Sequence, residues 1–378
     1  MRLSDARKSN LIIHFLILFI LPVFLVPAKA QDPTVSEDDT STLFYPSLPE
    51  APRIQFLASF SVAADVEEKK KKKSGWLSNF VLGEENPEDN EGPEKPYGVS
   101  LKNGQIHVVD TRGGGYAIFD VPDKDYRFIL GSGSAVMMKP VNIEIDNEGT
   151  KYVTDTQKGQ IFAFDSNDKF LKAYGERGQF RPTDVLVDED RLYVVDIQAH
   201  RIIVLDKESG IELSAFGGPG VEENNFFQPT NIALGPDKHL YISDTGNFRI
   251  QKFTRDGEYV QSFGAGVGTA PGDFARPKGI AVDRMGRLYV VDAAFERVQI
   301  FSSEGDLLLF FGEPASTHRG GMDLPTDIDI DYDSVPYFQQ YADPGFKLEY
   351  IIVVASQFGK NSVNVFGFGR HDAMSYDN

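Results

Sequence analysis

Short hydrophobic runs separated by turn-forming residues follow one another along most of the chain. Each run holds four to six residues, is rich in Val, Ile, Tyr and Phe, and is flanked by Gly, Asp or Asn. Three consecutive runs are LYISD at 240–244, FRIQKF at 248–253 and YVQSFG at 259–264. Runs of this length and composition predict short strands joined by tight turns in an antiparallel meander. We therefore expect an all-β protein.

A sequence repeat groups these strands into units. Six units each open with a proline and an apolar run, and the prolines recur every 42 to 48 residues. The openings are KPYGVSL (95–101), KPVNIEI (139–145), RPTDVLV (181–187), QPTNIAL (228–234), RPKGIAV (276–282) and LPTDIDI (324–330). Four strands per unit at this period are typical of β-propeller blades. The repeat predicts a six-bladed β-propeller over residues 95–369, followed by a tail at 370–378.

The last unit lacks one strand, because only three apolar runs precede the polar tail. A spare run, RIQFLASFSV at 53–62, stands before the first unit and has the pattern of an outer strand. Pairing this run with residues 362–369 would complete the sixth blade and remove an exposed strand edge. We predict that 53–62 is the closing strand and that 31–52 is an extended N-terminal segment.

The first thirty residues have the three-part order of a secretory signal. Basic residues come first, an apolar run follows at 11–26, and Ala28 and Ala30 provide small side chains where a peptidase would cleave. We predict a signal peptide at 1–30, cleaved near Ala30, and an extracytoplasmic location that is periplasmic, outer-membrane-associated or secreted. An uncleaved membrane anchor is the alternative, although Pro22 interrupts the short run.

Charge and cysteine content narrow the function. Residues 1–30 hold four basic and one acidic residue, so their removal changes the formal charge from −18 to −21. An acidic surface repels phosphate backbones, which disfavours a nucleic-acid partner. The chain has no cysteine, which excludes thiol catalysis, Cys-ligated metals and covalent haem attachment. No G-x-S-x-G, P-loop or H-E-x-x-H sequence is present, so hydrolase and nucleotide-binding motifs are missing.

Aspartates and arginines recur at fixed places in the units. Each predicted second strand of four units ends in an aspartate, and in three of them an arginine follows five residues later. Such residues are expected to serve the blade, because the carboxylate accepts backbone N–H groups of the next turn and pairs with the arginine. The residues are Asp155, Asp196, Asp244, Asp292, Arg201, Arg249 and Arg297.

The segment YISDTGNFRIQKF at 241–253 resembles the signature of NHL repeats, and weaker copies stand at 152–164, 193–205 and 289–301. This resemblance implies a six-bladed propeller but not one function, since NHL propellers include RNA binders, protein-binding modules, sensor ectodomains and a peptide-amidating lyase. The layout of the chain also resembles exported bacterial NHL proteins encoded near multihaem cytochromes. That likeness implies a multihaem cytochrome or an envelope complex as partner.

Polar residues of the predicted inner strands should face the central channel. Side chains alternate along a strand, so the second and fourth residues after each opening proline point the same way. Carboxylates and amides in one tunnel are costly unless they are hydrated, protonated or bound to a cation, and such oxygen ligands suit calcium. A water-filled channel is the alternative to a metal. The candidate ligands are Asn142, Glu144, Asp184, Asn231, Asp327 and Asp329.

A charged insert at 63–94 has no counterpart in the other units. Five consecutive lysines precede the only tryptophan and several apolar residues. This composition is typical of an amphipathic segment that docks on anionic lipids or on an acidic partner, and an ordinary flexible loop is the alternative. We expect the insert on the face that carries the loops between second and third strands. The residues concerned are Lys69, Lys70, Lys71, Lys72, Lys73, Trp76 and Phe80.

A second insert at 331–350 is rich in aromatic residues, including Tyr337, Phe338 and Tyr341. These side chains could anchor a partner, or they could form a packed plug under the closing blade. Together, the features favour an exported, non-catalytic binding or scaffold propeller that binds a protein or ligand, in association with extracytoplasmic electron-transfer complexes. The alternative function is a calcium-dependent hydrolase or lactonase acting at the channel mouth, by likeness of geometry to calcium-dependent lactonases on six-bladed propellers.

Overall fold

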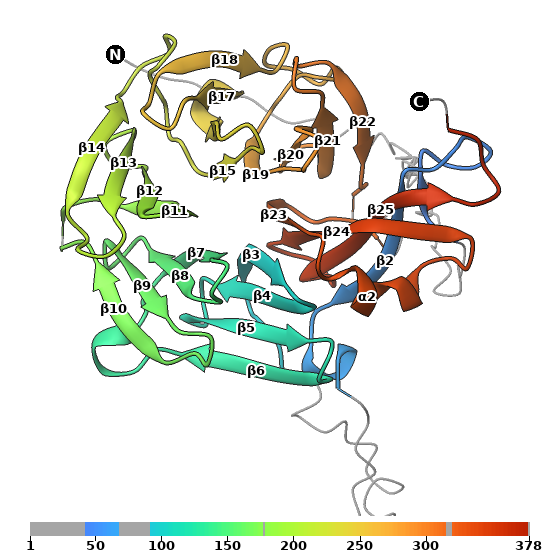
Figure 1. Cartoon of the computed structure of the whole chain (residues 1–378), viewed down its shortest axis with the longest axis horizontal. Helices are drawn as coiled ribbons and strands as arrows, with labels where there is room; N and C mark the ends of the chain where they lie inside the picture. Colours follow the sequence, from blue (N-terminus) through green and yellow to red (C-terminus); the bar gives the residue numbers. More distant parts are fainter. Residues whose placement is uncertain (1–41, 68–90, 177, 315–319, 377–378) are drawn as a thin grey trace, which may run out of the picture. The chain divides into compact units, whose positions relative to one another are not determined.

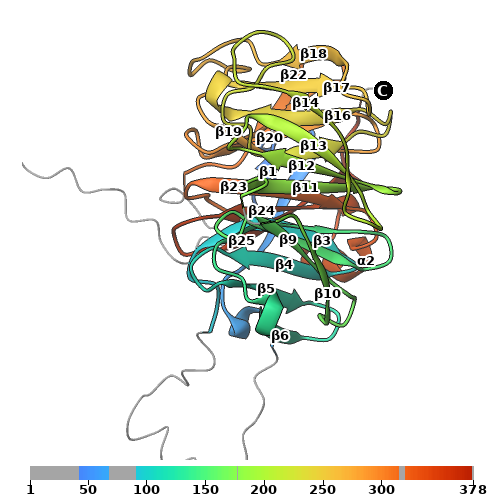
Figure 2. The ribbon, with the colours of Figure 1, turned by 90° about the vertical axis from the view of Figure 1, so that its left-hand side faces the viewer.

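The computed structural model describes residues 42–67, 91–176, 178–314 and 320–376 of the 378-residue chain. Six antiparallel sheets surround a central axis, which confirms the predicted all-β, six-bladed propeller (Figure 1). The side view in Figure 2 shows that the strands run across the ring from one face to the other. Among the described residues, no helix combines the length and hydropathy needed to cross a bilayer.

Five blades are four-stranded meanders with the strands in sequence order. Blade 1 contains β3 (Pro96–Lys102), β4 (Gln105–Asp110), β5 (Gly115–Asp120) and β6 (Asp125–Leu130). Blade 2 contains β7 (Pro140–Ile145), β8 (Lys151–Asp155), β9 (Gln160–Phe164) and β10 (Phe170–Tyr174). Blade 3 contains β11 (Pro182–Asp188), β12 (Arg191–Asp196), β13 (Arg201–Asp206) and β14 (Glu212–Gly217). Blade 4 contains β15 (Ile232–Leu234), β16 (Leu240–Asp244), β17 (Arg249–Phe253) and β18 (Tyr259–Phe263). Blade 5 contains β19 (Pro277–Val282), β20 (Leu288–Asp292), β21 (Arg297–Phe301) and β22 (Leu307–Phe311).

Blade 6 joins both ends of the described chain. Its strands are β23 (Pro325–Asp331), β24 (Phe346–Ser356), β25 (Val363–His371), β2 (Ile54–Phe60) and β1 (Phe44–Tyr45). Strand β2 pairs antiparallel with β25, with Ile54 opposite Phe368 and Phe60 opposite Val363, as the sequence predicted (Figure 1). The short outermost strand β1 lies within the segment expected to be merely extended, and it pairs with β2.

Short helical turns interrupt the connections. They are η1 (Ala63–Asp65), η3 (Gly133–Ala135), η4 (Thr245–Asn247), α2 (Val335–Phe338) and η5 (Gln339–Tyr341). The last two occupy the aromatic insert between β23 and β24.

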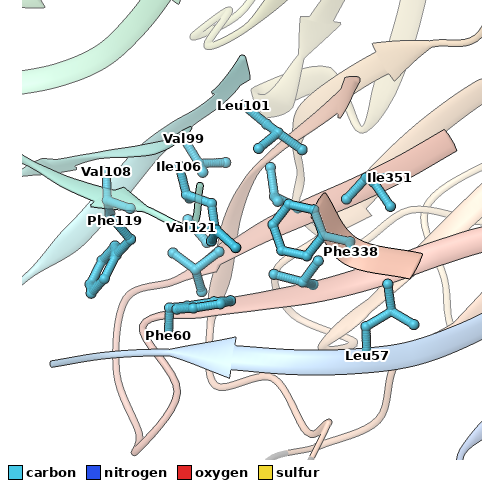
Figure 3. Close-up of a cluster of buried hydrophobic side chains, with 14 of the residues drawn as sticks. Leu57, Phe60, Val99, Leu101, Ile106, Val108, Phe119, Val121, Phe338 and Ile351 are labelled. Atoms are coloured by element: carbon cyan, nitrogen blue, oxygen red, sulfur yellow. The ribbon is translucent and has the colours of Figure 1, made fainter. Parts of the chain in front are cut away.

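Hydrophobic side chains fill the spaces between neighbouring blades. At the joint between blades 6 and 1, a cluster combines Phe60 of β2, Val99 of β3, Phe119 of β5 and Ile351 of β24 (Figure 3). Phe338 of α2 belongs to the same cluster and is fully buried. Burial of a large apolar side chain contributes roughly 1.5 to 3 kcal/mol, so this cluster stabilises the closed ring substantially.

The antiparallel order gives the propeller two distinct faces. The loop face carries the loops between second and third strands and the connections between blades, whereas the turn face carries the other turns. Both ends of the charged insert lie on the loop face, since Ala63 N donates to Glu91 O at 2.7 Å and Ser61 Oγ donates to Lys360 O at 2.7 Å. Lys69 to Lys73, Trp76 and Phe80 themselves lie outside the described residues.

Candidate functional site: the axial channel and its loop-face rim

The six inner strands enclose a cavity of about 250 Å³ on the axis. Five of the predicted axial residues line it, because alternation along each inner strand turns them inward. They are Asn142, Glu144, Asp184, Asp327 and Asp329. The sixth, Asn231, reaches Asp327 from two blades away, with 3.1 Å between its Nδ2 and Asp327 Oδ1.

The axial carboxylates accept hydrogen bonds from inner strands of the following blade. Asp327 Oδ2 accepts the Val99 N–H at 2.9 Å, and Asp184 Oδ2 accepts the Ile232 N–H at 2.9 Å. Inner strands have one edge facing the channel, where backbone donors would otherwise lack partners. These carboxylates therefore satisfy backbone groups that the fold itself leaves open.

Blade 6 extends this pattern into a ladder of three aspartates on β23. Asp329 Oδ2 accepts the Leu101 N–H at 2.8 Å and the Ser100 hydroxyl at 3.1 Å. Asp331 Oδ2 accepts the Asn103 N–H at 3.3 Å. Together with Asp327, alternate residues of β23 thus bind the N–H groups of two β3 residues and of Asn103 just after β3, and the ladder joins the last blade to the first.

Glycines permit the close approach of inner strands. A Cβ added at Gly279 would lie 2.4 Å from Asp327 Cα, and one added at Gly98 would lie 2.6 Å from Asn142 Cα. Separations below 3.0 Å are not tolerated against backbone, so both positions need glycine. The absence of a side chain leaves room for the Asn142 and Asp327 side chains inside the channel.

Burial dominates the electrostatics of the channel. It raises the pKa of Asp329 to about 6 and that of Asp184 to about 7. The pKa values of Glu144 and Asp327 are raised well above their ordinary range, first by burial and then by neighbouring carboxylates, Asp329 for Glu144 and Asp184 for Asp327. Buried acids of one sign disfavour each other's ionised form. Shared protons or a bound cation would therefore relieve the repulsion.

The described residues contain no group of three or more His, Asp or Glu side chains placed to hold a metal ion. Asp327 and Asp329 lie two residues apart on β23, and each already accepts backbone N–H groups. The predicted calcium ligands thus share one channel, with their oxygens largely occupied by protein donors.

The repeated aspartates bind the loop face together. Asp155 accepts the N–H groups of Gln157 and Lys158 in its own loop and of Met138 and Lys139 in the preceding connection, all within 2.6 to 2.9 Å. Asp196 and Asp292 make the equivalent bonds, and Asp244 accepts the Phe227 N–H at 2.7 Å. Asp110 has the same role in blade 1, and the sequence analysis did not include it among the repeated aspartates.

The repeated arginines divide into two groups. Arg249 Nε lies 2.8 Å from Asp244 Oδ2, and Arg201 Nε lies 3.4 Å from Asp196 Oδ2. Arg297 instead stacks over Phe295 and Phe310, each at 5.3 Å from the ring centroid.

Basic residues occupy four of the six equivalent positions around the channel mouth on the loop face, and the sequence analysis did not predict them. Lys95, Lys139, Arg181 and Arg276 each precede an opening proline. The backbone of these four residues is held in the same way in each blade. The N–H group of each one donates to the repeated aspartate of its own blade at 2.9 to 3.1 Å. Lys139, Arg181 and Arg276 are exposed and Lys95 is half-buried. The sequence repeat does show this feature, because the residue before the opening proline is K, K, R, Q, R and L in the six successive units.

Beneath this rim, Lys278 and Tyr97 meet over the start of β23. Lys278 Nζ donates to Tyr97 Oη at 2.6 Å, although the two residues come from blades 5 and 1. Lys278 is 5% exposed, and burial, followed by the charges of Arg276 and Lys95, lowers its pKa to about 8. Burial and the charge of Asp327 raise the pKa of Tyr97 to about 12.

The aromatic insert packs mainly inward. Phe338 is fully buried, so it cannot contact a partner in this fold. Of the two expected roles, it therefore has that of a residue packed under the closing blade. Tyr337 packs partly buried against the same cluster. Tyr341 is 39% exposed, and its ring lies 6.0 Å from that of Phe338.

The fold and the channel define a six-bladed β-propeller, and residues 226–253 match the family model of the NHL repeat. No curated protein sequence matches the chain. Similar solved structures include a streptogramin B lyase (15% identity, TM-score 0.50, covering 74% of this chain and 85% of that chain). A gluconolactonase from Xanthomonas campestris is also similar (16% identity, TM-score 0.53, covering 73% of this chain and 86% of that chain). A protein of unknown function from Bacteroides thetaiotaomicron is similar as well (15% identity, TM-score 0.56, covering 83% of this chain and 75% of that chain). At these identities the likeness shows the fold alone.

Proposed function

We propose that this chain is an exported, non-catalytic binding propeller whose axial carboxylates are structural and whose loop face recognises a protein or ligand. One observation carries the proposal: Asp184, Asp327 and Asp329 accept backbone N–H groups of neighbouring inner strands. Carboxylates used in this way hold the ring together. Recognition then falls to the exposed rim and loops, where propellers have room for variation.

The proposed location and partner rest on the sequence. The signal-like residues 1–30 support export, and the likeness to NHL proteins encoded near multihaem cytochromes supports an envelope protein or such a cytochrome as partner. The lysine-rich insert would add contact with an anionic membrane or an acidic surface, since its two ends lie on the loop face.

The test replaces channel carboxylates by their amides. Asp184→Asn and Asp329→Asn each keep an oxygen that can accept the backbone N–H but remove the charge that a cation needs. A structural role predicts folded variants, no stoichiometric calcium in the purified protein, and melting curves of the wild type that are equal with calcium and with chelator. Stoichiometric calcium that is lost in either variant would contradict the proposal.

A second candidate function is a calcium-dependent hydrolase or lactonase working in the channel. Its support is specific: four acidic side chains with raised pKa values line one cavity, and a cation would replace their protons. A gluconolactonase shares the fold. This function predicts calcium-dependent lactone hydrolysis that is abolished in Glu144→Gln, whereas the binding role predicts no hydrolysis in the wild type.

A further inference from the structure

We propose that Lys95, Arg276 and Lys278, with the hydroxyl of Tyr97, form a binding site for an oxyanion, a carboxylate or phosphate group of a small ligand, at the loop-face mouth of the channel. The inference deepens the binding role proposed above and rests on it, because it names the chemistry that the rim would recognise.

The site is assembled by ring closure. Lys95 and Tyr97 stand at the start of β3 in blade 1, and Arg276 and Lys278 stand at the start of β19 in blade 5. Blade 6 lies between them, and the small Thr326 of β23 donates its hydroxyl to Tyr97 O at 2.7 Å. The Lys278 side chain can therefore extend past blade 6 to Tyr97 Oη.

The positive charges of this site lack acidic partners. Among the described residues, none of the ion pairs with a carboxylate involves Lys95, Arg276 or Lys278. Lys95 instead lies over the ring of Phe358, 5.6 Å from its centroid. An ammonium has three hydrogens to donate, yet Lys278 Nζ has one hydrogen-bond partner in the described structure, the neutral phenol of Tyr97. An oxyanion would supply the missing acceptors.

Mutual repulsion gives this arrangement a reason to bind an anion. The charges of Arg276 and Lys95 act together with burial to lower the pKa of Lys278 to about 8. The charge of Asp327 acts in the opposite direction on the pKa of Lys278, but Asp327 accepts its hydrogen bonds from Val99 N and Asn231 Nδ2. Its two side-chain oxygens are thus occupied by donors other than the cations of this site.

The surroundings favour a small ligand over a polyanion. Lys139 and Arg181 continue the ring on the other side of the mouth, which would guide an anion toward the axis. The chain as a whole carries a formal charge of −18, so a long polyanion would meet repulsion beyond the rim. A single carboxylate or phosphate group matches a local basic site on an acidic protein.

Isothermal titration of the purified full chain, freed of metal with chelator, provides the test. Inorganic phosphate and citrate serve as probes. Their relative affinities show whether the site prefers a phosphate group or a carboxylate group. We expect the wild type to bind at least one probe, with affinity falling as salt rises. Lys278→Gln should weaken binding about tenfold or more, because it removes a charge-assisted hydrogen bond. Arg276→Gln, at an exposed position that folding does not need, should weaken binding several-fold.

Lys169→Gln is the matched control, because Lys169 is an exposed lysine in a turn-face turn of blade 2 and its loss changes the net charge equally. It should bind as the wild type does. The inference is overturned if the wild type binds neither probe, or if all three variants bind alike. Loss of anion binding alone would leave the binding role intact, whereas calcium-dependent turnover would overturn the binding role whatever the probes show.

Discussion

Asp329 in the last blade accepts a hydrogen bond from the backbone N–H of Leu101 in the first blade, at 2.8 Å. The ring is thus closed twice. At the outer side, β2 pairs with β25 through main-chain hydrogen bonds, and at the channel the aspartates of β23 bind the N–H groups of β3. The two closures lie at opposite edges of blade 6. One uses main-chain pairing between strands and the other uses side-chain carboxylates, and both resist opening of the ring.

The carboxylate ladder predicts a stability loss when an acceptor is removed. Asp329→Ala should lower the free energy of unfolding by about 1 to 3 kcal/mol, because the Leu101 N–H is left without its acceptor. Urea denaturation measures the change. Asp333→Ala removes an exposed carboxylate just beyond the ladder and should have almost no effect. Equal losses in the two variants would mean that the ladder does not stabilise the ring.

The raised pKa of Asp329 predicts a pH effect of definite sign. The folded protein keeps the proton up to about pH 6, whereas the unfolded chain loses it near its ordinary pKa of 3.8. Because the folded state then binds more protons, the free energy of unfolding falls as pH rises through this window, by up to about 1.4 kcal/mol per pH unit. Asp329→Asn should lack this fall. Denaturation of both proteins at several pH values between 4 and 7 compares the slopes, and parallel slopes would refute the assignment.

His107 predicts the opposite dependence of the free energy of unfolding on pH. It is 1% exposed, and neither ring nitrogen has a hydrogen-bond partner among the described residues. Burial, followed by the charge of Lys151, lowers its pKa from 6.5 to about 3. The unfolded chain therefore binds the proton first, and the free energy of unfolding falls as pH drops below 6.5, by up to about 1.4 kcal/mol per pH unit.

His107→Phe should remove this acid sensitivity, because the unfolded chain no longer gains a proton at that position. Thermal melts between pH 4 and 7 report the difference from the wild type. His239→Gln, at a partly exposed turn-face position, should keep the wild-type slope. An unchanged slope in His107→Phe would show that His107 is not the group responsible.

The aromatic insert predicts a contrast between two neighbouring residues. Phe338→Ala should lower the free energy of unfolding by about 3 to 5 kcal/mol, since it opens a cavity in the cluster between blades 6 and 1. Tyr341→Ala removes a more exposed ring and should cost much less. Chemical denaturation of both variants measures the two costs, and a small loss for Phe338→Ala would contradict the packed arrangement.

The closing strand predicts the outcome of truncation. Deletion of residues 31–62 removes β1 and β2 and exposes the edge of β25, which should unfold the protein or make it associate. Deletion of 31–41 alone, which ends before β1, is the control and should behave as the wild type in size-exclusion chromatography. A 31–62 deletion that matches the control in size and melting temperature would refute closure by β2.

The sequence alone determined the number of blades, four strands in each, the closing strand and the residues that face the channel, although it did not predict the short outermost strand β1. These follow from local rules: a repeat of constant period, runs of strand-forming residues, and alternation of side chains along each inner strand. Asp184 and Asp329 could be placed in the channel for that reason. The basic residues before four of the opening prolines are also visible in the sequence. Their common place at one mouth of the channel follows only from the structure, in which the blade aspartates bind their backbone N–H groups.

Only the tertiary structure decided the contacts that depend on ring closure. Lys278 and Tyr97 are 181 residues apart, and no local pattern indicates that their side chains meet across blade 6. Burial of Phe338 likewise depends on β2, β4 and β24 converging around a short helix, since an aromatic loop has the same composition whether packed or exposed. Arg297 lies over two phenylalanine rings rather than beside Asp292, because neighbouring side chains, not the repeat, set its direction. Alternation fixes which way a side chain points, and closure of the ring fixes what it meets.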